Sequence, residues 1–100
     1  MSLEVRPEYL DTDTAEFFAT VPQFNTTGAT WGELLGLVGY VVEDYVIDSA
    51  GELNAAPTLR AVEEQLATNH EMSPFLRGRM WELLAVAAWA VEHGRQIEWC

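Results

Sequence analysis

The sequence contains no lysine, and its charge balance narrows what the chain can bind. It has five basic residues, all arginines, against 16 acidic residues, so the formal net charge is −11. A field of this sign repels nucleic acid and anionic membrane surfaces, and it attracts basic proteins over a long range. We therefore expect no direct binding to nucleic acid, and we expect the partner to be a basic protein or nucleoprotein complex.

Cysteine is almost absent as well. The single cysteine, Cys100, can form no disulfide within the chain and no thiol cluster for a metal. The opening residues alternate charge and do not resemble a secretion signal. We therefore expect a cytoplasmic protein, and arginine without lysine is compatible with the GC-rich genome of a bacterium or its phage.

Long apolar runs are missing. The most apolar stretch, residues 31–46, has only residues 34–42 free of charge between Glu33 and Glu43. Residues 83–91 form a second uncharged run of the same length. A membrane-spanning helix needs roughly 20 such residues. We therefore predict no membrane segment.

Motifs for catalysis or metal binding are also missing. The chain has no C-x-x-C, H-E-x-x-H, E-x-x-H or G-x-S-x-G motif and no glycine loop that would hold a phosphate. Its two histidines, His70 and His93, fall at predicted helix ends, where the helix dipole stabilises a cation. We therefore predict a protein that is not an enzyme and that has no metal and no cofactor.

The hydrophobic content of 49 % is enough for one core, so residues 1–100 are predicted to form a single domain. Capping residues, prolines and apolar periodicity predict an all-α bundle of about four helices. These helices are expected at residues 14–20, 31–49, 57–69 and 74–93. Residues 1–10 are expected to be irregular, residues 23–29 a loop, and residues 95–100 a short extended tail packed on the bundle.

The second predicted helix contains three glycines, although each weakens a helix by roughly 0.8–1 kcal/mol relative to alanine. Gly32, Gly36 and Gly39 fall together on one flank when successive residues are placed 100° apart. We expect this flank to be a smooth groove for helix packing, filled by the alanine-rich helix at residues 74–93.

The side of that helix opposite its predicted core face is the candidate partner-binding surface. Its acids surround an apolar and aromatic strip, and acids near the first helix could extend the same patch. The candidate residues are Glu33, Leu37, Tyr40, Glu43, Asp44, Ile47 and Asp48, with Asp11, Asp13 and Glu16. The alternative is that the strip is buried between two layers of the bundle and that the acids only confer solubility.

Three functions follow from this pattern. The first is an acidic protein that binds and inhibits or masks a basic partner. Phage-encoded inhibitors of nucleases or CRISPR complexes, and immunity proteins against toxins, share its small size, acidity and lack of catalytic motifs. The second is a self-associating structural or adaptor domain, such as a homodimer, because Trp81 and Trp89 add apolar surface to the last helix. The third is a small-ligand-binding or enzymatic domain with a pocket between helices.

Overall fold

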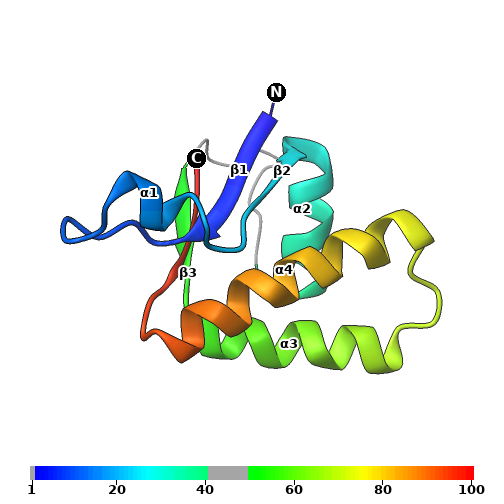
Figure 1. Cartoon of the computed structure of the whole chain (residues 1–100). Coiled ribbons are helices and arrows are strands. Elements are labelled where there is room, and N and C mark those ends of the chain that lie inside the picture. Colours follow the sequence, from blue (N-terminus) through cyan, green and yellow to red (C-terminus); the bar gives the residue numbers. More distant parts are fainter. Residues whose placement is uncertain (1, 41–49) are drawn as a thin grey trace.

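The computed structural model describes residues 2–40 and 50–100, and within them the chain forms a four-stranded antiparallel sheet together with four helices. Figure 1 shows the long helices packed together beside the strands. The elements are β1 (Ser2–Pro7), α1 (Ala15–Phe18), β2 (Phe24–Thr27), α2 (Gly28–Leu37), β3 (Gly51–Leu53), α3 (Ala55–Thr68), α4 (Pro74–Glu92) and β4 (Ile97–Trp99). The prediction of an all-α bundle is therefore wrong.

The sheet has the strand order β2-β1-β4-β3, so the strands from the two ends of the chain are neighbours at its centre. Val5 lies opposite Trp99, and Arg6 lies opposite Glu98. The residues predicted to be irregular, the predicted loop and the predicted tail supply β1, β2 and β4. Each strand is too short to be stable alone, and pairing between distant segments makes them strands.

Side chains alternate across the sheet, as the two-residue period of a strand requires. One face is buried and enters the core through Leu3, Val5, Phe24, Leu53, Ile97 and Trp99. The opposite face carries charged residues, among which Arg6 pairs with Glu98 at 3.1 Å. The helices α2, α3 and α4 supply the rest of the core, including Trp31, Leu34, Val62, Met80 and Leu83.

The helices α3 and α4 run antiparallel beside each other (Figure 1). Both agree with the sequence prediction, although α3 begins two residues earlier than expected, at Ala55. The helix α4 also contacts β1, β4 and α2, so it lies centrally in the fold. One side of α4 is therefore committed to the core.

The helix α2 differs most from its prediction. It begins at Gly28, because the hydroxyl of Thr27 accepts a hydrogen bond from the amide of Thr30, and it ends at Leu37. Within α2, Trp31, Leu34 and Leu35 are fully buried. Residues 38–40 of the predicted helix lie beyond this end, and residues 41–49 lie outside the described residues.

Gly39 explains why α2 ends where it does. Its φ of 87° is in the left-handed region, which favours glycine. The amide of Gly39 donates to the carbonyl of Gly36 at 3.2 Å, and the amide of Tyr40 donates to that of Leu35 at 2.9 Å. This pair of bonds is a Schellman motif, a common helix ending. Gly39 therefore terminates the helix and is not part of a groove along it.

Candidate protein-binding surface

The helix α4 is fixed at both ends by local signals. The Ser73 hydroxyl accepts a hydrogen bond from the amide of Leu76 at 3.2 Å, and Pro74 occupies the first helical position. At the other end Gly94, with a φ of 66°, provides a left-handed C-terminal ending. These signals set the two ends of a helix of nineteen residues.

The outer side of α4 exposes aromatic side chains together with the charged residues Glu82 and Glu92. Phe75 is 60 % exposed and Trp81 is 56 % exposed, the two highest values among the large hydrophobic side chains described. Positions three, four or seven apart share one side of a helix. Phe75 and Trp81 are each three positions from Gly78, so both rings project from the exposed side of α4, about 120° apart, with the half-buried Trp89, exposed small residues and Glu82. We call this surface the aromatic face, and it comprises Phe75, Gly78, Trp81, Ala85, Ala88 and Trp89.

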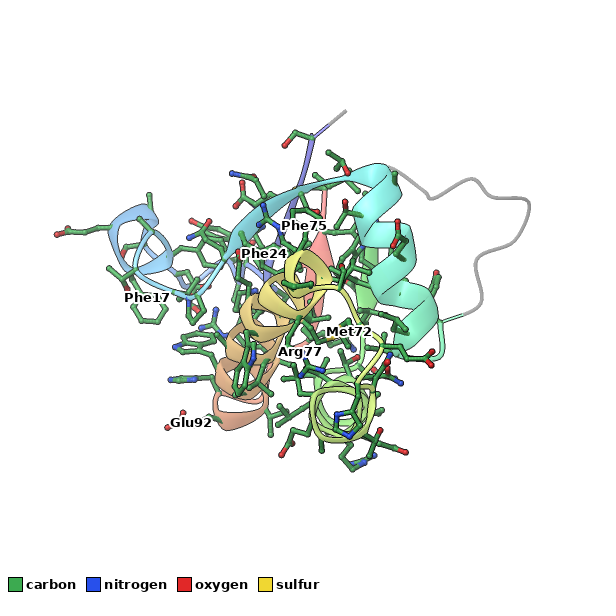
Figure 2. The ribbon with its side chains drawn as sticks, turned by 90° about the vertical axis from the view of Figure 1, so that its right-hand side faces the viewer. Phe17, Phe24, Met72, Phe75, Arg77 and Glu92 are labelled. Atoms are coloured by element: carbon green, nitrogen blue, oxygen red, sulfur yellow. The ribbon has the colours of Figure 1, made fainter. Side chains whose placement is uncertain are left out.

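A second element extends the aromatic face at its C-terminal end. Phe17 of α1 lies 6.2 Å from the Trp89 ring, centroid to centroid, and is 42 % exposed. The imidazole of His93 stacks on the Trp89 ring, with 3.8 Å between the two ring centroids. In Figure 2, Phe75 and Glu92 mark the two ends of α4, and Phe17 projects from α1. The face thus joins residues from two elements that are far apart in the sequence.

The arginines mostly bond to the protein itself. Arg77 donates to the carbonyls of Leu66 and Asn69, at 3.0 and 2.6 Å. Arg79 donates to the carbonyl of Asn25 and to the carboxylate of Glu82, each at 3.1 Å.

The other two engaged arginines form ion pairs. Arg6 pairs with Glu98 and Glu4, and Arg95 pairs with Asp13. Arg60 has no hydrogen bond or ion pair within the described residues. Four of the five cations are therefore already neutralised or held by the chain.

Most of the described acids, in contrast, have no partner. Five of the side chains accept bonds, namely those of Glu4, Glu8, Asp13, Glu82 and Glu98. The carboxylates without a hydrogen bond or ion pair inside the described ranges are those of Asp11, Glu16, Glu33, Glu52, Glu63, Glu64, Glu71 and Glu92. The unpaired charge at the surface is therefore almost entirely negative.

The candidate residues on α2 are only partly accounted for by the structure. Glu33 and Tyr40 are exposed and Leu37 is half-buried. The Tyr40 ring also packs edge-on against Trp99 at 6.0 Å, so it has a structural role. Glu43, Asp44, Ile47 and Asp48 lie outside the described residues. The structure therefore does not test whether the α2 strip is a surface.

The acids proposed near the first helix separate into two kinds. Asp11 and Glu16 are exposed and unpaired among the described residues. The Asp13 side chain is only 4 % exposed and forms two hydrogen bonds with Arg95. These bonds, and one from the Leu10 amide, hold the pKa of Asp13 below its ordinary value. Asp13 therefore stabilises the fold and is not free for a partner.

The expected glycine groove is not found at Gly36. This glycine is exposed, and a Cβ placed there would meet no described atom within 4 Å. Gly32 is half-buried and Gly39 ends the helix. Instead, α4 packs chiefly along α3.

The three aromatic residues of the aromatic face could be foreseen from the sequence, whereas Phe17, which extends the face, could not. Phe75, Trp81 and Trp89 fall outside the main apolar side of their helix when the residues are placed 100° apart. Phe17 carried no such signal, because its contact partner Trp89 lies over 70 residues later in the chain. Its role depends on tertiary structure alone.

Within residues 2–40 and 50–100, no group of three or more histidine, cysteine or acidic side chains could hold a metal ion. His93 lies where the sequence predicted, at the end of α4, with its Nδ1 2.8 Å from the carbonyl of Trp89. No helix in the same residues is long and apolar enough to cross a bilayer.

No family model, curated protein or solved structure matches this chain. The anti-CRISPR and immunity-protein hypotheses have no support in the described residues or in these comparisons. Function is therefore inferred from the surface itself.

Proposed function

We propose that this protein is a non-enzymatic binding protein that masks a basic macromolecular partner, a protein or nucleoprotein, through the aromatic face of α4. The observation that carries the proposal is the exposure of Phe75 and Trp81 on a helix whose other side is buried in the core. Large aromatic residues on a rigid element are the usual anchors of a protein interface.

The charge distribution supports a basic partner. Unpaired carboxylates such as Glu16 and Glu92 lie on the elements that form the aromatic face, and four arginines are held internally. A negative surface speeds the encounter with a positive one, while desolvated rings hold the complex together. The composition favours the cytoplasm as the place of binding, because the single cysteine can form no disulfide within the chain.

The test uses an amphipathic helical peptide built of leucine and lysine, with a leucine and glutamate peptide as the control. Isothermal titration should show binding of the lysine peptide only. The double variant Phe75→Ala/Trp81→Ala should weaken this binding by about 30-fold, which is the effect of losing one strong anchor residue. Tyr40→Ala removes an exposed ring from the segment that follows α2, and it should change the affinity little.

Two outcomes would contradict the proposal. A loss of binding in Tyr40→Ala, with the double variant unaffected, would place the interface at the segment that follows α2. An affinity that does not fall as salt is raised from about 0.05 to 0.5 M would show that charge does not steer the encounter. Sedimentation of the free protein tests the self-association alternative, because a dimer abolished by Trp81→Ala would mean that a second copy occupies the face.

A further inference from the structure

We infer that the Trp81 ring is the receptor for a cationic side chain, an arginine or lysine, presented by the partner. This inference rests on the proposed function and names the chemical group that the aromatic face recognises. It starts from a difference between Trp81 and the other rings on this surface.

The other rings each lie near an arginine of the protein. The Arg95 guanidinium carbon is 5.3 Å from the Trp89 centroid and 5.8 Å from the Phe17 centroid. That of Arg79 is 5.6 Å from the Phe75 centroid. A cation within about 6 Å of a ring centroid is attracted by the negative charge above the ring. The rings of this surface are therefore arranged as cation receptors.

Trp81 has no such cation among the described residues, although tryptophan is the best of the aromatic receptors. Arg79 is only two positions away, but the carbonyl of Asn25 and the carboxylate of Glu82 hold its guanidinium. Arg77, four residues before Trp81, is held by the carbonyls of Leu66 and Asn69. The residues three before and four and seven after Trp81 are Gly78, Ala85 and Ala88. These small residues leave the ring accessible.

Charge complementarity selects the occupant. A second copy of this chain would bring a net charge of −11, and four of its five arginines would be engaged internally. It therefore has few cations to offer and would be repelled. A basic partner has both the charge that the surface attracts and the group that the free ring can hold. Glu92 lies eleven residues further along the same side of α4, roughly 16 Å away, where it could pair with another basic side chain.

The experiment compares two amphipathic peptides, one of leucine and arginine and one in which neutral citrulline replaces arginine. Trp81→Leu keeps an apolar side chain without a ring, and Trp81→Phe keeps a ring. Trp81→Leu should weaken binding of the arginine peptide by about fivefold and Trp81→Phe by less, while neither changes binding of the citrulline peptide. Val91→Ala, at another exposed position of α4, is the control and should leave both affinities unchanged.

Two results would overturn the inference. Equal losses with both peptides would make Trp81 an apolar anchor, and equal affinities of Trp81→Leu and the wild type for the arginine peptide would exclude the ring as a receptor. Both leave the proposed function standing if Phe75→Ala/Trp81→Ala still binds about 30-fold more weakly than the wild type. If that double variant binds the arginine peptide as tightly as the wild type, the proposed function fails with the inference. Thermal melts confirm that each variant is folded, as expected for exposed positions.

Discussion

The Arg95 guanidinium and the Asp13 carboxylate form two hydrogen bonds, 2.5 and 2.8 Å long, between residues 82 positions apart in the chain. The same guanidinium lies near the Phe17 and Trp89 rings and donates to the carbonyl of Glu8. It therefore ties the segment around α1 to the end of α4 and positions Phe17 at the edge of the aromatic face. A charged pair with two bonds fixes geometry as well as adding stability.

Asp13→Asn should destabilise the protein most at neutral pH. Because Arg95 lowers the pKa of Asp13 in the folded state, the pair stabilises the fold fully above the ordinary value of 3.8 and loses this contribution as the pH falls through the lowered pKa. Melting temperatures of wild type and variant, measured between about pH 7 and pH 2, should converge toward acid. A difference that grows on acidification would contradict the role given to the pair.

Gly39→Ala and Gly36→Ala should have opposite effects on the free energy of unfolding, although the sequence predicts that both glycines belong to one helix. Alanine at Gly39 must adopt a left-handed conformation, at a cost of about 1–2 kcal/mol. Alanine at Gly36 meets no described atom and should stabilise α2 by about 0.5–1 kcal/mol. Urea denaturation measures both, and a destabilised Gly36→Ala would restore the idea of a close helix crossing there.

Local signals predicted the helices α3 and α4, because the ends of each helix and its buried side are determined by residues close together in the sequence. Pro74 and Gly94 limit α4, and the spacing of Leu59, Val62 and Leu66 marks the buried side of α3. The end of α2 was also within reach, because Gly39 is a normal helix-stop residue. The apolar residues that follow Gly39 favoured a longer helix, so the prediction continued into residues 41–49, which lie outside the described residues.

The sheet could not be predicted in the same way. The strands β3 and β4 have three residues each, so the alternation in residues 95–100 gave too little pattern to identify a partner. The pairing of Val5 with Trp99 joins the two ends of the chain, and no local propensity encodes such a contact. The candidate surface shares this limit, since Phe17 reaches Trp89 only through the fold.

Gly51→Ala should test the packing where β3 meets β4. A Cβ at Gly51 would overlap the ring of Trp99, which lies opposite it in the sheet and is almost fully buried. Because a buried indole has little room to move, the overpacking should cost about 1–3 kcal/mol in the free energy of unfolding. Gly78→Ala is the control: it adds the same methyl group to an exposed position of α4 with no described atom nearby, and it should stabilise the helix.

Arg77→Met should destabilise the connection between α3 and α4 without touching the aromatic face. Arg77 donates to the carbonyls of Leu66 and Asn69 at the end of α3. Its positive charge also interacts favourably with the negative end of the α3 helix dipole. Methionine keeps most of the apolar chain but leaves both carbonyls without this donor, which should cost about 1.5–3 kcal/mol. Arg60→Met is the matched control, because Arg60 is exposed and has no hydrogen bond or ion pair in the described part of the chain. Equal melting temperatures for the two variants would show that the bonds to the end of α3 contribute nothing to stability. A lower melting temperature for Arg77→Met alone, with peptide binding retained, would show that Arg77 stabilises the helix pair and that the outer face binds independently of it.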